Sequence, residues 1–92
     1  IKGVLKYMKD GVETVVPAGS FVPFEIEPTY NRIGTVTVSE GGQFELRLRS
    51  EYKYDWDTDN VGFQFSDGGK VYEFTFDSLR ELFNHEGDIL LN

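Results

Sequence analysis

The stretch QFELRLR, residues 43–49, alternates strictly between apolar and polar side chains. Successive side chains of a β-strand point to opposite faces of a sheet, so this pattern predicts a strand with one buried and one solvated face. Phe44, Leu46 and Leu48 would enter the core. Such alternation is typical of antiparallel sheets, which commonly bury one face and leave the other in water.

Similar stretches lie on both sides of this one. Residues 61–66 (VGFQFS) and 71–76 (VYEFTF) alternate in the same way, and residues 1–8, 12–16, 20–27 and 33–39 are rich in β-branched and aromatic residues. Glycine turns separate several of these runs, at residues 9–11 (KDG), 40–42 (EGG) and 67–69 (DGG). Because glycine tolerates the positive φ of tight hairpin turns, we expect a hairpin about each of them.

The hydrophobic period changes after residue 76. Leu79, Leu82 and Phe83 follow the i, i+3, i+4 spacing of a helix, and Ser78 with Glu81 forms a capping-box pattern at its start. Gly87 is placed to end the helix, which predicts one short helix over residues 78–86. The apolar residues at 89–91 then predict a closing strand.

These elements define the expected fold class. Seven or eight short strands with one short helix predict a mostly β protein, an antiparallel two-sheet β-sandwich. The chain has 92 residues and shows neither a long linker nor an internal repeat, so residues 1–92 are expected to form a single domain.

Charge and composition exclude several function classes. Sixteen Asp and Glu against nine Lys and Arg give a net charge of −7, which disfavours nucleic acids and anionic membranes as partners. The absence of cysteine excludes disulfides, thiol catalysis and thiolate metal sites. No apolar run approaches the roughly 20 residues of a membrane-spanning helix, so we expect no membrane insertion.

The first half of the chain resembles a known family. Residues 1–4 (IKGV), 17–22 (PAGSFV) and 35–46 (TVTVSEGGQFEL) are similar to the first strand, the second-strand entry and the glycine-turn hairpin of carboxypeptidase regulatory-like domains. Those domains have the transthyretin-like, or prealbumin-like, sandwich fold. The resemblance covers about residues 1–48 and implies a non-catalytic domain of a secreted or surface protein, with a transthyretin-like or immunoglobulin-like sandwich.

Residues 55–60 (DWDTDN) suggest a metal site. Asp55, Asp57 and Asp59 place carboxylates at alternate positions, as at the start of an EF-hand loop, and carboxylate oxygens are ligands that Ca²⁺ prefers. The rest of that motif is absent, since Asn60 stands where glycine is needed and Ser66 where the bidentate glutamate is needed. The alternative is a solvated loop in which Asp and Asn form local turns.

Three aromatic residues precede and enter this loop. Tyr52, Tyr54 and Trp56 continue the parity of Phe44, Leu46 and Leu48. If exposed, the three rings would form a binding surface for a protein or a sugar, since amphipathic rings are enriched at interfaces. The alternative is an ordinary aromatic core with a bulge in the strand.

Other titratable residues do not predict catalysis. His85, the only histidine, falls in the last turn of the expected helix, where a positive charge complements the helix dipole. Glu25 and Glu27 share one strand face, which a solvated surface explains. We therefore expect no enzyme and no catalytic residues.

The expected function is that of a non-enzymatic structural or protein-interaction module. Because the chain begins at Ile1 without a signal segment, we expect a processed mature protein or, preferably, a domain of a larger secreted, cell-surface or virion surface protein. Its partners would be another protein or neighbouring domains. The alternative is a small carbohydrate-binding module that uses Tyr52, Tyr54 and Trp56 as its aromatic platform.

Overall fold

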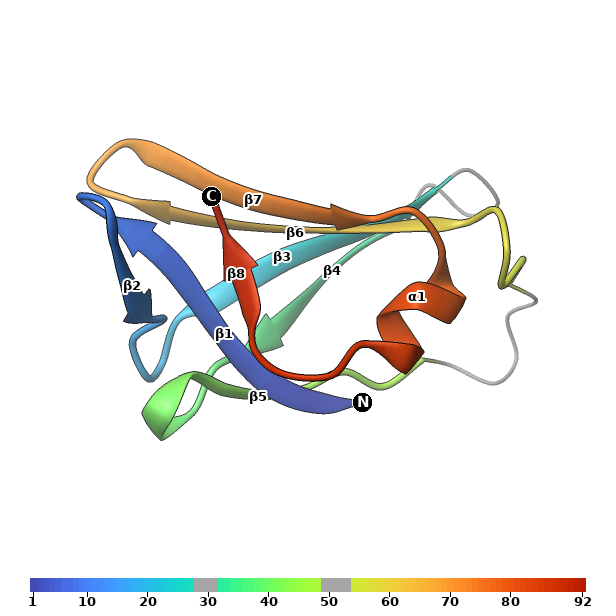
Figure 1. Cartoon of the computed structure of the whole chain (residues 1–92), viewed down its shortest axis with the longest axis horizontal. Helices are drawn as coiled ribbons and strands as arrows, with labels where there is room; N and C mark the ends of the chain where they lie inside the picture. Colours follow the sequence, from blue (N-terminus) through green and yellow to red (C-terminus); the bar gives the residue numbers. More distant parts are fainter. Residues whose placement is uncertain (28–31, 49–53) are drawn as a thin grey trace.

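The computed structural model describes residues 1–27, 32–48 and 54–92. Within these ranges the predicted class is confirmed: the chain is mostly β and forms a sandwich of two four-stranded sheets with one short α-helix (Figure 1). The elements are β1 (Lys2–Lys9), β2 (Val12–Val15), β3 (Phe21–Glu27), β4 (Arg32–Thr37), the 3-10 turn η1 (Glu40–Gly42), β5 (Gln43–Glu45), β6 (Asn60–Asp67), β7 (Lys70–Phe76), α1 (Leu79–Asn84) and β8 (Ile89–Leu91).

Strand β1 organises the first sheet. Its first half pairs antiparallel with β5, with Gly3 opposite Phe44, and its second half pairs antiparallel with β2. Strand β8 runs alongside β1 in the same direction, with Leu5 opposite Ile89. The closing strand predicted at residues 89–91 is therefore present. Its pairing is parallel, a direction that the sequence does not indicate, because the alternation of side chains carries no information on strand direction.

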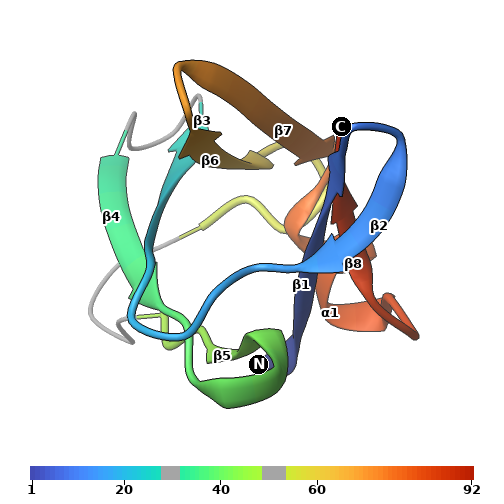
Figure 2. The same cartoon turned by 90° about the vertical axis from the view of Figure 1, so that its left-hand side faces the viewer.

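The second sheet has the strand order β4-β3-β6-β7, and all of its pairs are antiparallel. Phe24 on β3 stands opposite Phe63 on β6, which in turn stands opposite Phe74 on β7. Figure 2 shows that this sheet curves around the core, with β7 and β6 along the top and β4 at the side.

The two sheets are joined where β8 meets β7. The backbone N–H of Asn92 donates to the carbonyl of Glu73 at 3.1 Å, and the N–H of Glu73 donates to the carbonyl of Asn92 at 2.9 Å. A side chain adds a second link, since the hydroxyl of Tyr7 on β1 donates to Asp67 Oδ2 on β6 at 2.9 Å. Burial, followed by this hydrogen bond, raises the pKa of Tyr7 above its ordinary value.

At residues 40–42 the predicted hairpin is wrong. Strand β4 pairs with β3, whereas β5 pairs with β1, so the turn η1 carries the chain from one sheet to the other. The N–H of Ser39 donates to the carbonyl of Gln43 at 2.7 Å and closes this corner. Gly42 has a φ of 75°, and a Cβ there would lie 2.7 Å from the carbonyl oxygen of Leu5. Glycine is thus required by the corner between sheets, not by a two-stranded hairpin.

The core lies between the two sheets. Its buried hydrophobic residues alternate along the strands as the sequence predicts, and β5 with the residues after it contributes Phe44 and Leu46, with Leu48 partly buried beside them. The full set is Leu5, Tyr7, Val16, Val22, Ile26, Val36, Val38, Phe44, Leu46, Val61, Phe63, Phe65, Tyr72, Phe76, Leu79, Leu82, Ile89 and Leu91.

The remaining turns and the helix follow the sequence closely. The β1–β2 and β6–β7 hairpins turn at Asp10-Gly11 and Gly68-Gly69, all four with positive φ. The N–H of Glu81 donates to Ser78 Oγ at 3.1 Å and caps α1, as predicted. The helix ends at Asn84, two residues earlier than predicted, because His85 is extended. In the part of the chain that the structure describes, no helix has the length and apolarity that a bilayer crossing requires.

Candidate functional site

Residues 54–59, which directly precede β6, fold into a tight turn at one end of the sandwich. Asp55 Oδ1 accepts hydrogen bonds from the backbone N–H groups of Asp57 and Thr58, both at 3.1 Å. The N–H of Asp59 donates to the carbonyl of Asp55 at 2.9 Å. Hydrogen bonds from the Thr58 side chain and from backbone N–H groups hold the pKa of Asp55 below its ordinary value, because they favour the charged carboxylate.

Asp59 fixes this turn from the inside. Its side chain is fully buried, and its Oδ2 accepts from the N–H of Asp55 at 2.9 Å. A buried carboxylate is stable only when hydrogen bonds replace its lost hydration, so Asp59 is a structural part of the turn.

Asp57 and Arg80 connect the turn to the helix. Arg80 Nε lies 2.7 Å from Asp57 Oδ1, and the backbone N–H of Arg80 donates to the carbonyl of Trp56 at 3.0 Å. The Asp57 carboxylate raises the pKa of the Arg80 guanidinium. The ion pair itself is largely exposed and contributes little to stability, but together the two contacts hold the turn in one position against α1.

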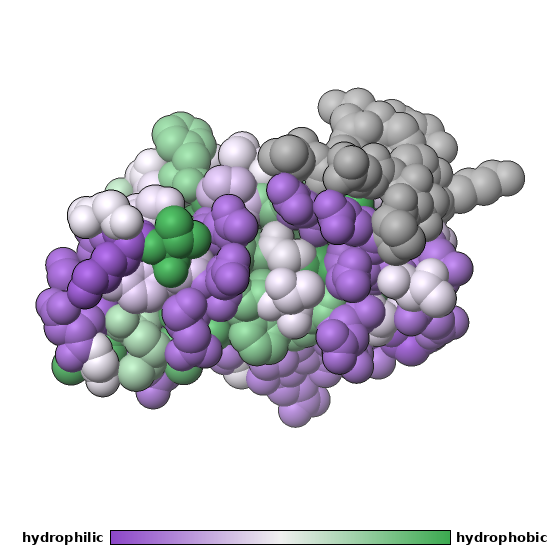
Figure 3. Space-filling view, turned by 90° about the horizontal axis from the view of Figure 1, so that it is seen from above, coloured by the Kyte–Doolittle hydropathy of each residue, from purple (hydrophilic) through white to green (hydrophobic). Residues whose placement is uncertain are grey.

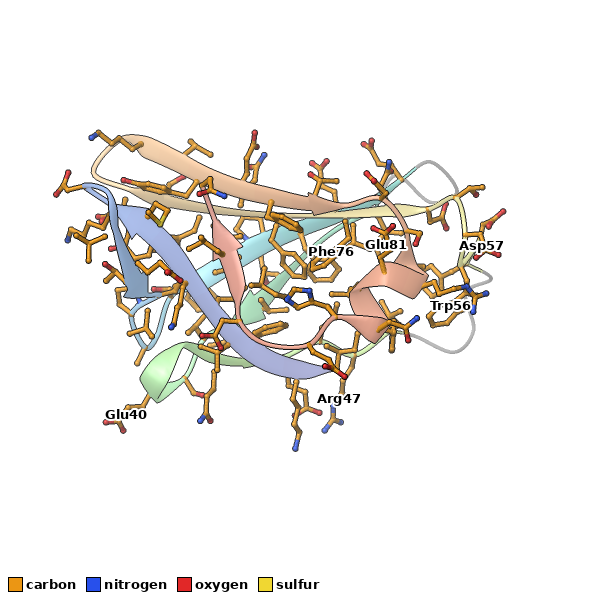
Figure 4. The ribbon with its side chains drawn as sticks, in the orientation of Figure 1. Glu40, Arg47, Trp56, Asp57, Phe76 and Glu81 are labelled. Carbon is orange, nitrogen blue, oxygen red and sulfur yellow. The ribbon has the colours of Figure 1, made fainter. Side chains whose placement is uncertain are left out.

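An exposed pair of aromatic rings completes this end of the molecule. Trp56 packs edge-to-face against Phe83 of α1, with ring centroids 4.8 Å apart and an interplanar angle of 64°. Trp56 is 41% exposed and Phe83 is 43% exposed. Figure 4 shows Trp56 and Asp57 side by side at the end of the sandwich, next to α1. We name the surface formed by Trp56, Asp57, Arg80 and Phe83 the aromatic end.

The predicted aromatic platform is only partly on this surface. Tyr52 lies outside the described residues, and Tyr54 is partly buried and packs against the core. Trp56 is exposed, so Tyr54 and Trp56 do not form one exposed set. The shared parity depends on one unbroken strand, whereas β5 ends at Glu45 and residues 55–59 form a turn.

The three aspartates have three different environments. Asp55 caps the turn, Asp57 binds Arg80 at the surface, and Asp59 is buried. Among the residues that the structure describes, no group of three or more His, Asp or Glu side chains is placed to hold a metal ion. Calcium binding by Asp55, Asp57 and Asp59 stays a prediction of the sequence.

His85 and the glutamates of β3 are not members of the aromatic end. His85 Nε2 lies 3.1 Å from the carbonyl oxygen of Asp88, and its ring packs edge-to-face against Phe76. Glu25 and Glu27 lie exposed on the outer face of β3, which agrees with the predicted shared strand face.

Sequence reasoning missed two members of the aromatic end. Phe83 falls on the apolar stripe of the helix and is therefore predicted to be buried, whereas α1 is too short and too close to the end of the sandwich to cover it. Arg80 carries no local signal, because its partner Asp57 is 23 residues away.

Comparisons with known proteins add no family to this description. Searches of the chain against protein-family models, curated protein sequences and solved structures find no match. The resemblance of residues 1–48 to carboxypeptidase regulatory-like domains therefore stays a prediction. The fold and the geometry of the aromatic end are the basis for the functional argument.

Proposed function

We infer that the chain is a non-enzymatic protein-interaction or structural module that contacts a partner through the aromatic end. The observation that carries this proposal is the exposed edge-to-face pair of Trp56 and Phe83, held in place by Arg80 and Asp57. Tryptophan and arginine are the residues most enriched at energetically dominant positions of protein interfaces.

The apolar surface that a partner would cover on Trp56 and Phe83 is large enough for the two rings to anchor it. Covering the exposed part of each ring would contribute about 2 kcal/mol, at about 25 cal/mol per Å² of apolar surface. Before the costs of association are subtracted, the two rings together correspond to at most about a thousandfold in affinity. Because the turn and α1 already hold both rings, little conformational entropy is lost on binding.

The geometry favours a protein partner over a sugar. Stacking on a carbohydrate needs rings that present flat faces in one plane, whereas Trp56 and Phe83 meet at 64°. A protein side chain can enter the angle between two such rings, and Asp57 and Arg80 supply the charged border typical of an interface rim. As part of the same proposal, the module belongs to a larger secreted, cell-surface or virion surface protein.

Selection of binding peptides tests the proposal. A random peptide library displayed on phage is selected against the immobilised chain, and selected peptides are measured against the variants Trp56→Ala and Phe83→Ala. We expect each variant to weaken binding by about tenfold or more, while Val12→Ala, which truncates an exposed apolar residue on β2, leaves it unchanged.

Two results would contradict this function. Selected peptides that bind both ring variants as well as the original chain would remove the aromatic end from the interaction. Binding of oligosaccharides on a glycan array that is lost in Trp56→Ala would support the carbohydrate-binding alternative instead.

A further inference from the structure

The outer face of the second sheet has a gap in its centre. Glu25 on β3 stands opposite Gly62 on β6, and Gly62 stands opposite Thr75 on β7. These three residues form one row across the face that points away from the core. Because Gly62 has no side chain, the middle of the row is empty.

Neither a positive φ nor a clash with the core requires glycine at this position. Gly62 does not have a positive φ, and a Cβ there would meet only Thr75 Oγ1, at 3.3 Å. Gly3 and Gly34 differ, since a Cβ at either position would lie 2.9 Å from a phenylalanine ring, Phe44 or Phe24. At those two positions a ring occupies the space of the missing side chain, whereas at Gly62 the one close neighbour is the hydroxyl of a threonine on the outer face.

The gap forms a groove that follows β6 between the side chains of β3 and β7. It consists of two adjoining hollows of ≈ 90 and ≈ 100 Å³, which share Glu25, Gly62 and Thr75. Figure 3 looks onto this face and shows a pale strip in its centre, with hydrophilic side chains on its left and right and hydrophobic atoms below it. Binding pockets for drug-sized molecules are about 300–1,000 Å³, so the groove fits a single side chain and not such a ligand.

The walls of the groove carry negative charge. Glu25 and Glu27 line it from β3, and Glu73 lines it from β7, while no Lys or Arg is among the described residues that line either hollow. Within it, Gln64 Nε2 lies 3.4 Å from Glu73 Oε2, a weak hydrogen bond.

Several cations of the chain are paired with carboxylates elsewhere. Lys6 binds Asp88, Lys9 lies near Asp67, and Arg80 binds Asp57. Arg47 likewise binds Glu45. Among the described residues, no Lys or Arg forms an ion pair with Glu25, Glu27 or Glu73, so these carboxylates can attract a cation from another molecule.

The same face also presents apolar side chains. Pro23 lines the groove, and Phe21 lies two residues earlier on β3, on the same face and 70% exposed. Val71 on the outer face of β7 is 57% exposed. In Figure 3 hydrophobic side chains appear toward the β6–β7 turn, beyond the hydrophilic ones. The face therefore combines an acidic groove with an apolar border.

We propose that this sheet face binds an extended basic segment of a partner protein. A lysine or arginine of the segment lies with its aliphatic stem over Gly62 and its charged group against Glu25 and Glu73, and a neighbouring apolar side chain packs on Pro23 and Phe21. Charge complementarity selects this occupant, because long cationic side chains bury their stems on apolar surface and keep the charge at a carboxylate. A second copy of this chain is disfavoured, since its net charge is −7.

The groove and the aromatic end are separate surfaces, so either proposal can fail without the other. The probe is a blocked pentapeptide of alternating valine and lysine, titrated into the ¹⁵N-labelled chain at about 50 mM salt, where screening is weak. We expect backbone amide shifts centred on Glu25, Gly62 and Thr75. The same peptide with glutamate in place of lysine should produce none.

Two variants test the groove by different routes. Gly62→Val fills it, and the double variant Glu25→Gln/Glu73→Gln removes two of its three carboxylates, those placed against the bound cation, with little change of its shape. We expect each to weaken peptide binding by about tenfold. The matched control Glu13→Gln/Glu40→Gln removes two exposed carboxylates elsewhere and should leave the affinity within about twofold, if only the groove matters.

Other results would overturn the proposal. These are shifts spread over all acidic surfaces, an equal loss in the control variant, or no binding of the lysine peptide. Equal shifts on adding Ca²⁺ alone or a simple diamine would assign the groove to a small cation. Concentration-dependent shifts at Gly62 without peptide would assign it to a second copy of the chain.

Discussion

The ring of Phe44 occupies the space that a side chain at Gly3 would need. The two residues stand opposite each other on β5 and β1, and a Cβ on Gly3 would lie 2.9 Å from Phe44 Cε1. A phenylalanine lying over a cross-strand glycine compensates for the packing that the glycine lacks. The same relationship joins Phe24 to Gly34 in the other sheet.

Replacing this glycine should destabilise the fold. We expect Gly3→Ala to lower the free energy of unfolding by about 1–3 kcal/mol, because the added methyl group displaces the buried Phe44 ring. The control Gly62→Ala, also in a strand, should change it by less than about 1 kcal/mol, because the entropic gain of alanine opposes a single close contact with Thr75 Oγ1. Urea denaturation measures both, and equal stabilities of the two variants would contradict the packing argument.

The buried carboxylate of the turn should matter more than the exposed one. Asp59→Ala removes the acceptor of the Asp55 N–H and should lower the free energy of unfolding by about 1–3 kcal/mol. Asp57→Ala removes only the exposed pair with Arg80 and should cost much less. Thermal unfolding of both variants checks this order, and a larger loss in Asp57→Ala would refute it.

The pKa of Asp55 predicts acid sensitivity of the turn. Because folding lowers this pKa below its ordinary value of 3.8, its contribution to stability is present above pH 3.8 and is lost as the pH falls through the folded-state pKa. Titration of the side-chain carboxyl by ¹³C NMR should give a midpoint below 3.8. A midpoint at or above that value would show that the N–H groups do not stabilise the carboxylate.

The raised pKa of Lys6 predicts a loss of stability at high pH. Its hydrogen bond to Asp88 raises its pKa above the ordinary 10.5, so its contribution is complete below pH 10.5 and is lost as the pH rises through the folded-state pKa. Asp88→Asn should reduce the alkaline part of the stability profile, measured as melting temperature against pH. The acid part of the profile should keep its Asp55 transition in this variant.

Fluorescence quenching can measure how Phe83 shields Trp56. Trp56 is the only tryptophan, so its emission is observed without interference. Phe83→Ala should increase quenching by acrylamide by up to about twofold, because Trp56 is 41% exposed and Phe83 covers one edge of it. Val12→Ala is the control, and unchanged quenching in Phe83→Ala would contradict the ring contact.

The sequence predicts side-chain faces well and strand partners poorly. The alternation at residues 43–49 identifies Phe44 and Leu46 as core residues, but it does not show that β5 pairs with β1 instead of β4. Pairing is decided by contacts between distant segments, and a glycine turn serves a corner between sheets as well as a hairpin. The capping box of Ser78 was predictable because it is local.

The candidate sites show the same limit. Trp56 could be singled out from the sequence, but its exposed partner Phe83 and its positioning residue Arg80 come from a helix more than 20 residues away. Glu25 and Glu27 could be placed on one face, whereas the opposing Glu73 and the gap at Gly62 depend on the register of three strands.

The parallel pairing of β8 with β1 has a kinetic consequence. Leu5 stands opposite Ile89, so this contact closes a loop of nearly the whole chain, and Asn92 then links β8 to β7. Ordering so long a loop is entropically unfavourable until other contacts have formed. The two hairpins can form early and locally, while β8 adds last and closes the sandwich. We expect folding on the scale of milliseconds to seconds, as for other proteins dominated by non-local strand pairs.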